Sequence, residues 1–549
     1  MRYAGLFLQT RGVAIHYNPD PPRLEYMSTG FVQKLVVTNR LQSLSRPSRN
    51  GEETRFTKVT RTVPMDIILE IAQRLTSLGA LLDFGLISRS TYHILLPTLY
   101  AHVQLDSNDQ CRATLSYLAR EPDVAIFVKS LVVRPNHRIW DSNAHQEEQD
   151  EAWIADLVSL IAAQGKFRLL ESFHWDGMEV PKDRLWLKLR SFCPRLRHIG
   201  CSVGQNPLHG ESELFKFVNL AGFSLTSHTC NFRHHRSFHQ VTPEETDLPD
   251  SLWTMLLENS PQLERLVLNG RQDHLWRISR VSEGRWPAMR KLSLGYHAGG
   301  INNHPPFREF LSVHPLLRDI TLTGLRFEPW DVSEETSLLD VPAVEVYTGF
   351  WPIHRSTISY PMYKSIKSVT AYHVMWIPSS WMMTTVFPTL KKKLPSLTSL
   401  SMSVEFRSRV GVTTLDFFRS LFSSCPSLTH LELLSSSHFD LEDFATALED
   451  APSLATFTLV KVPKLASEDL TRSAVRLLRH KPSLRSFTIA HVCPWRRSEE
   501  FLVKHKGIYE MIPGPGGIPS SIFVSETAHK RGQRQTRRYR LDLSDVATS

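Results

Sequence analysis

The residues best suited to metal or acid–base chemistry form one cluster near the middle of this 549-residue chain. Five side chains able to bind zinc lie close together there, namely His228, Cys230, His234, His235 and His239. Their spacing matches no standard zinc motif, and the polar residues around them favour an inserted loop. The glycine-rich run 514–517 is flanked and interrupted by prolines, which lack the N–H donors of a phosphate-binding loop, so we interpret it as a turn. The chain has no GxSxG, HExxH or Walker A sequence, so we expect no catalytic residue, no metal and no cofactor.

Composition and charge narrow the classes of partner. Hydrophobic residues make up 41% and charged residues 22%, which is enough apolar material for a folded core. The six cysteines form no CxxC pair and are too sparse to staple the chain, which indicates a reducing compartment, the cytoplasm or the nucleus. The net charge is +9, but residues 1–63 contribute +6 and residues 495–549 contribute +4, leaving −1 for the residues between them. A neutral centre without a long apolar run predicts neither a nucleic-acid nor a membrane partner.

The chain is long enough for several domains or for one repeat array. Residues 1–61 mix prolines, arginines and short apolar runs without a helical or strand period. We therefore expect them to form a largely disordered basic extension, with an organelle-targeting segment as the alternative.

Three helix signals follow in residues 62–105. Thr62 can cap a first helix with Pro64 in its first turn, Ser77 restarts a second, and Ser88 can cap a third that Pro97 interrupts. Helices this short cannot bury all their apolar residues among themselves, so part of that surface should meet another protein. The alternative is a helical subdomain packed onto its own chain.

Residues 63–105 resemble an F-box, in the form common in fungal F-box proteins, through their helical apolar pattern and the Leu96-Pro97 and Leu99-Tyr100 pairs. The resemblance departs from the family at Val63, where leucine is usual, and at Gly85 inside the second helix. It implies that the segment binds an SKP-type adaptor and, through it, a cullin scaffold. The residues that the resemblance assigns to this contact are Pro64, Ile67, Ile68, Ile71, Leu75, Leu81, Leu82 and Leu86.

Downstream, one short pattern recurs, in which a proline is followed by residues spaced LxxΦxΦ, where Φ is apolar. The prolines of its copies are Pro194, Pro261, Pro287, Pro315, Pro395, Pro426, Pro452 and Pro482. Their shorter gaps are 26 to 31 residues, and weaker copies occur near 128–133, 170–175, 341–342 and 366–369. Proline ends a helix, and the alternating residues after it suit a short strand, so this period predicts stacked helix–strand units.

The pattern is similar to degenerate leucine-rich repeats, which implies a solenoid over residues 106–495 with a parallel sheet on the concave side and helices on the convex side. The expected fold class is α/β, with the three-helix F-box first and twelve or thirteen repeat units after it. The asparagine that this family often places after the strand occurs at Asn269 but is mostly missing elsewhere.

Strand residues that point away from the core should line the concave face and bind a protein target. We expect this for Arg265, Val267, Lys291, Ser293, Asp319, Thr321, Ser399, Ser401, His430, Glu432, Thr456, Thr458, Ser486 and Thr488. The charged members, taken as candidate target-binding residues, are Arg265, Lys291, Asp319, His430 and Glu432. The alternative is that these are solvated strand residues without a ligand.

Residues 496–549 should form a cap and a basic tail. Segments 522–524 and 539–543 alternate like strands and predict a hairpin over the end of the array, joined by a basic connector at 530–538. That connector is either a solvated loop or a nuclear-localisation patch. Together with the resemblances, the sequence predicts a non-enzymatic target-recognition subunit of an SCF-type ubiquitin ligase, and the alternative is an F-box scaffold that takes no part in ubiquitin transfer.

Overall fold

The computed structural model describes residues 64–542, apart from the gaps 76–77, 136–150, 205, 207, 228–243, 271–273, 296, 299–304, 324–342, 350–363, 372–376, 407–412, 436, 463–469, 482, 495–500, 514–518 and 531–532. The chain divides into two compact units. The described residues of the first unit are 64–227 and 244–289, and those of the second are 290–542. The cluster predicted at 228–239 and the turn at 514–517 lie outside the described residues.

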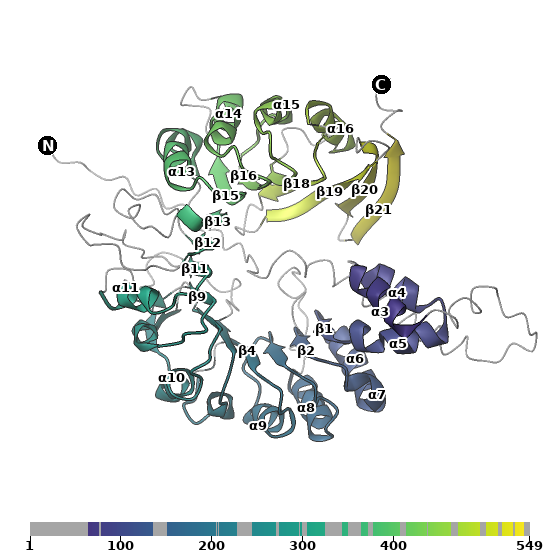
Figure 1. Cartoon of the computed structure of the whole chain (residues 1–549), viewed down its shortest axis with the longest axis vertical. Helices are drawn as coiled ribbons and strands as arrows, with labels where there is room; N and C mark the ends of the chain where they lie inside the picture. The colour runs from purple at the N-terminus through teal and green to yellow at the C-terminus, as the bar shows by residue number, and fades with distance from the viewer. Residues whose placement is uncertain are drawn as a thin grey trace, which may run out of the picture. The chain divides into compact units, whose positions relative to one another are not determined.

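The first unit begins with three helices, α3 (Met65–Arg74), α4 (Leu78–Gly85) and α5 (Arg89–Leu99) (Figure 1). Ser88 caps α5 as predicted, because its hydroxyl accepts a hydrogen bond from the Thr91 N–H. Two details of the prediction were wrong. Pro64 is the N-cap of α3 and not a first-turn residue, and Pro97 lies inside α5 without ending it. The helix runs only two residues beyond Pro97, so the missing N–H costs it a single hydrogen bond near its end.

A ladder of parallel strands follows in the first unit. Its strands, in pairing order, are β1 (His102–Leu105), β2 (Ser130–Val133), β3 (Ser172–Trp175), β4 (His198–Val203), β5 (Gly222–Ser227) and β7 (Arg265–Asn269). The strand β1 falls inside the range 62–105 given to the F-box, yet it is part of the ladder. The intervening helices are α6 (Asn108–Arg120), α7 (Pro122–Ala125), α8 (Glu151–Ala163), α9 (Asp183–Phe192), η3 (Glu213–Lys216) and α10 (Asp250–Leu257).

An insertion interrupts the repeat pattern near β7. Strands β6 (Glu244–Asp247) and β8 (His274–Arg277) pair in parallel with each other and not with the ladder, and η4 (Ser279–Glu283) follows. The repeat period does not predict this small sheet.

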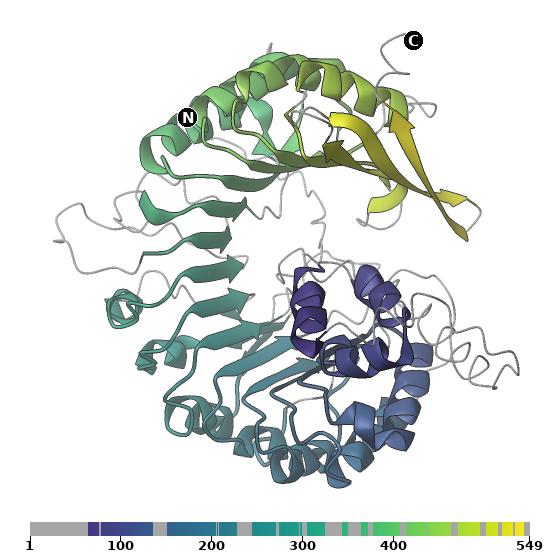
Figure 2. The ribbon, with the colours of Figure 1, turned by 45° about the vertical axis from the view of Figure 1, so that its right-hand side comes forward.

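The second unit carries a longer parallel ladder. Its strands are β9 (Lys291–Gly295), β11 (Asp319–Thr323), β12 (Val346–Gly349), β13 (Ser368–Ala371), β15 (Ser399–Glu405), β16 (His430–Ser435), β17 (Thr456–Lys461) and β18 (Ser486–Pro494). The short strand β14 (Ile377–Pro378) pairs in parallel with β15, and the short strand β10 (His297–Ala298) follows β9 in the chain. The helices are α11 (Pro305–Ser312), α12 (Ser379–Trp381), η8 (Met382–Val386), α13 (Phe387–Lys393), α14 (Thr414–Ser424), α15 (Leu441–Ala447), η10 (Leu448–Asp450) and α16 (Leu470–His480). Within each unit, the helices that alternate with the ladder strands flank one side of those strands (Figures 1 and 2).

The second unit ends in antiparallel strands. The strand β19 (Phe501–Pro513) pairs with β18, β20 (Pro519–Lys530) pairs with β19, and β21 (Gln533–Asp542) pairs with β20. The predicted pairing of 522–524 with 539–543 is confirmed for Ile522 to Val524, which lie opposite Leu541 to Tyr539. The basic connector predicted at 530–538 is too long, because residues 533–538 belong to β21. The strand β19 was not predicted.

The ladders keep an exact register that sorts side chains into columns. On β16, β17 and β18 the second residue points into the core, and these residues, Leu431, Phe457 and Phe487, are at most 3% exposed. The leucines Leu428, Leu431, Leu454 and Leu484 are buried as predicted. The α/β class, with mostly parallel strands and stacked helix–strand repeats, is therefore confirmed. Three residues expected on the open face, Val267, Ser293 and Thr321, are instead buried.

Candidate protein-binding surfaces

Apolar side chains are exposed on the three-helix segment α3–α5. Its own core consists of Ile68, Ala72, Leu81, Leu95 and Leu99. At about 100° per residue, the apolar residues of α3, from Ile67 round to Leu69, form a stripe roughly 200° wide, more than this core covers. Ile67 and Ile71 lie one turn apart along one edge of this stripe, and they are 51% and 40% exposed. We call these two residues the α3 isoleucine pair.

The eight residues predicted to contact an adaptor differ in how exposed they are. Ile68 and Leu81 are buried in the core of the segment, whereas Leu75 and Leu82 are half-buried. The exposed members are Pro64, Ile67, Ile71 and Leu86. Two further exposed apolar residues were missed, Met65 and Ile87. Their positions beside Pro64 and Leu86 in the sequence are the signal that could have found them.

On the second ladder, the predicted target-binding residues contact their neighbours in the same column. The Lys291 ammonium lies 2.7 Å from the Asp319 carboxylate. Ser401 donates to Glu432 over 2.9 Å, and the His430 ring contacts the Thr456 hydroxyl. The polar face is thus held in a fixed arrangement by bonds between adjacent repeats.

Among the five candidates, only His430 is exposed, and the other four are half-buried. The structure brings Lys291 and Asp319 together and places His430 and Glu432 on one strand. Arg265 belongs to the first unit, where it begins the last strand of that ladder. Their role in binding a target remains a prediction.

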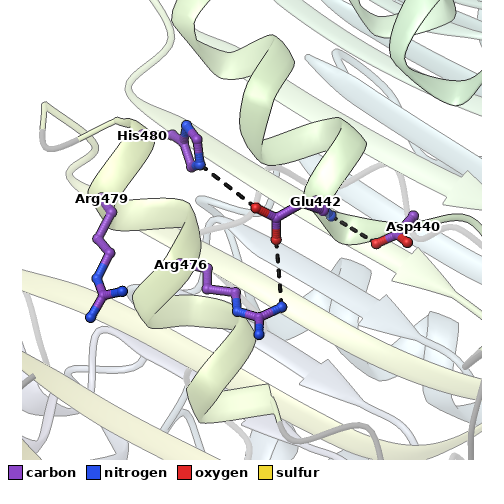
Figure 3. Close-up of a pocket in the computed structure, with 5 residues that line it drawn as sticks. All are labelled: Asp440, Glu442, Arg476, Arg479 and His480. Atoms are coloured by element: carbon purple, nitrogen blue, oxygen red, sulfur yellow. Dashed lines mark hydrogen bonds and ion pairs between the residues drawn. The ribbon is translucent and has the colours of Figure 1, made fainter. Parts of the chain in front are cut away.

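A pocket of about 510 Å³ lies on the helical side of the second unit, lined by Asp440, Glu442, Arg476, Arg479 and His480 (Figure 3). Glu442 lies 3.5 Å from Arg476 and 3.9 Å from His480. Asp440 accepts from the Glu442 N–H over 3.0 Å and so caps α15. These ionic contacts connect α15 to α16, so the charged residues that line the pocket have a structural role.

Cysteine chemistry is suppressed where the structure describes it. Cys111, Cys193, Cys201 and Cys425 are buried. Burial raises the pKa of the Cys111, Cys193 and Cys425 thiols to about 12 and raises that of Cys201 too. Thiols held protonated at neutral pH are poor nucleophiles, so these four do not suit covalent catalysis.

Two further features are absent from the described residues. No group of three or more His, Cys, Asp and Glu side chains there is arranged to hold a metal ion. Among the helices of that part of the chain, none combines the length and apolarity needed to cross a bilayer.

Comparisons with known proteins give weak likenesses. No protein-family profile and no curated protein match the chain. A crystal structure of the Rad7 and Elc1 complex in yeast is 13% identical with a TM-score of 0.38, over 80% of this chain and 96% of that one. A structure of the TLR13–ssRNA13 complex is 13% identical with a TM-score of 0.27, over 66% of this chain and 54% of that one. Scores this low establish neither a shared fold nor a shared function.

Proposed function

We propose that this chain is the target-recognition subunit of an SCF-type ubiquitin ligase. In this proposal, the segment α3–α5 is an F-box that binds an SKP-type adaptor, the adaptor connects it to a cullin, and the repeats hold a protein target. The observation that supports it most is the α3 isoleucine pair, which is exposed on a helix whose sequence resembles an F-box.

The energetics favour a partner over an open apolar surface. Fully burying an exposed isoleucine side chain contributes about 1.5–3 kcal/mol, and each member of the pair has about half of its surface left to bury, so the pair can contribute to a specific contact together with its neighbours. Met65 and Leu86 are exposed as well, at 56% and 36%. Exposed apolar residues gathered on one short segment are typical of protein interaction sites.

The second half of the proposal concerns the repeats. Strand faces of stacked repeats are usual binding surfaces, and the one here carries hydroxyl and paired charged groups rather than a stripe of basic residues. A protein target suits this surface better than a nucleic acid. The alternative function is an F-box scaffold that binds the adaptor without directing ubiquitin transfer.

The test uses exposed residues, because substitution of the buried Ile68 would also unfold the segment. We expect Ile67→Asp with Ile71→Asp to reduce adaptor binding by more than about a hundredfold, since two apolar contacts are lost and charges are left facing apolar atoms. The matched control is Gln73→Asp, which adds the same carboxylate at an exposed position on another side of α3. Binding is measured by titrating the purified full chain with an SKP-type adaptor.

Three outcomes are informative. Loss of binding in the double variant with retention in Gln73→Asp supports the F-box. Equal binding by all three proteins contradicts it. Recovery of the adaptor without a cullin from cells expressing the full chain favours the scaffold alternative.

A further inference from the structure

The polar strand face of the second unit continues onto the antiparallel strands at its end. Cross-strand partners in a sheet point to the same face, so register alone fixes the columns. One column runs from Ser486 through Glu510 and Phe523 to Arg540. Its neighbour runs from Thr488 through Ile508 and Ser525 to Arg538. We call these the terminal columns.

The opposite face of the same strands is the one that packs on α16. There, Thr471 of α16 donates to Glu526 over 2.6 Å and lies 2.9 Å from the Tyr539 hydroxyl. Glu526 lies opposite Arg537 in the register, so Arg537 is on this helix-facing side. Adjacent arginines of β21 therefore belong to different faces, Arg537 to the helix-facing side and Arg538 to the terminal columns.

The terminal columns carry an exposed aromatic residue beside positive charge. Phe523 is 38% exposed and lies between Glu510 and Arg540, and the neighbouring column contains the half-buried Ile508. The outermost residues of both columns are arginines, and both are exposed. Glu510 is the acidic member of the two columns, so they carry a net positive charge.

Charge on an edge strand has a simpler explanation, because arginine at a sheet edge discourages aggregation with other strands. Within the described residues, β21 pairs with β20 alone, so it is such an edge. Protection of the edge does not require an aromatic residue exposed on the neighbouring strand. The combination of Phe523 with arginines on the same face is what a ligand with both apolar and acidic groups would use.

We propose that the terminal columns bind an extended acidic segment of the target protein, with an apolar side chain on Phe523 and Ile508 and a carboxylate at Arg538. This inference rests on the proposed function in that the occupant belongs to the target. A carboxylate fits because guanidinium binds it with two parallel hydrogen bonds. An extended segment fits because about ten residues span roughly 33 Å, enough to cross three strands spaced about 4.8 Å apart.

The experiment measures peptide binding to the purified full chain by fluorescence anisotropy. The probe is a labelled peptide of about twelve residues in which glutamates surround a central Phe-Leu pair, a length sufficient to cross the three strands. Two companion peptides replace either every glutamate by lysine or the Phe-Leu pair by alanines. The protein variants are Phe523→Ala and Arg538→Gln, and the matched control is Arg537→Gln on the other face of β21.

We expect the acidic peptide to bind the unaltered chain, more weakly at high salt because exposed charges are screened. Phe523→Ala and Arg538→Gln should each weaken binding by about threefold to tenfold, as expected for one contact. The control Arg537→Gln should bind as the unaltered chain does. Arg538→Glu should reverse the preference toward the lysine peptide, which shows a charge effect even if one neutral variant is poorly folded.

The inference is overturned if the unaltered chain does not bind the acidic peptide, if it binds the lysine peptide equally well, or if Arg537→Gln weakens binding as much as Arg538→Gln. None of these measurements involves the adaptor. Failure of the α3 isoleucine test would therefore contradict the F-box proposal while leaving this result unchanged, and the reverse also holds.

Discussion

In the first four repeats, charged or hydroxyl residues occupy the position after the strand where leucine-rich repeats often have asparagine. The position directly after the fourth residue of the strands β1 to β4 is occupied by Asp106, Arg134, Asp176 and Ser202. Arg134 lies 2.9 Å from Asp176 and 3.7 Å from Asp106, and Ser202 donates to Asp176 over 2.8 Å. Two ionic contacts and one hydrogen bond therefore connect four consecutive repeats in a largely buried row, at the position that Asn269 occupies in β7.

The importance of this row can be measured at Arg134, whose side chain is 11% exposed. Arg134→Ala should lower the free energy of unfolding by about 3–5 kcal/mol, because it removes the cation that lies between two largely buried carboxylates. The matched control is Arg184→Ala, whose pair with Asp156 has side chains 71% and 62% exposed. That change should cost less than about 1 kcal/mol. Equal midpoints of urea unfolding for the two variants would show that the row does not stabilise the ladder.

A second residue-scale prediction concerns pH and His198. Burial lowers the pKa of this imidazole, and Arg265 and Arg197 act in the same direction, while Glu264 and Glu171 oppose them. The folded state therefore favours the neutral ring, whereas the unfolded chain takes up a proton below about pH 6.5. Because the unfolded state binds more protons, stability should fall as the pH drops from about 6.5 toward the lower folded pKa.

The measurement for His198 is the free energy of unfolding of the first unit at neutral and mildly acidic pH. His198→Asn should be less sensitive to acid than the unaltered chain, because asparagine does not titrate in this range. His102, on the same column but exposed, is the control position, because His102→Asn makes the same substitution outside the buried site. An identical pH profile for His198→Asn and the unaltered chain would contradict the assignment.

At the scale of elements, local signals predicted the units and missed the pairings that depend on distant partners. Ser88 begins α5 because a cap acts within one turn, and the proline before each strand likewise acts on its neighbours. The strand β19 has no such signal, since it forms by pairing with the otherwise open edge of β18. The burial of Ile68 was equally hidden, because it lies on the same apolar stripe as the exposed Ile67.

The sequence likewise predicted only part of the candidate site. The sequence identified the columns of β15 to β18, because alternation assigns faces within each strand. It did not identify Phe523 or Arg538, because their face depends on the register of β19 and β20 against the ladder. It also could not show that Lys291 and Asp319 pair, which requires knowing that their strands are neighbours.

Stacking makes each repeat depend on its neighbours, and β16 is a suitable place to test this. Leu431→Ala should cost about 2–5 kcal/mol, because the side chain is 2% exposed and the adjoining repeats cannot collapse into the void. Leu434→Ala, on the other face of the same strand, removes the same atoms from a half-buried position and should cost clearly less. Chemical denaturation of the two variants provides the comparison, and similar losses would contradict the assignment of faces.

For the whole molecule, the proposed function requires two activities that can be separated along the chain. Contacts in a repeat array are mostly with neighbouring units, so a change in one region need not disturb another. The structure also indicates where a deletion of the F-box-like segment should end. The deletion should remove residues 62–100 and stop there, because β1 pairs with β2 and its loss would expose the first strand of the ladder.

Deleting residues 62–100 should abolish adaptor binding while the target stays bound, and the half-life of that target in cells should lengthen. The reciprocal change is Thr458→Lys with Ser486→Lys, which adds bulk and charge on neighbouring strands of the polar face, where both residues are half-buried. This variant should bind the adaptor normally and release the target, because unmatched charge across an interface opposes association. Turnover of captured partners with and without a proteasome inhibitor measures the effect. A scaffold predicts that deletion alters complex assembly but leaves every partner's half-life unchanged, and that result would contradict a role in target degradation.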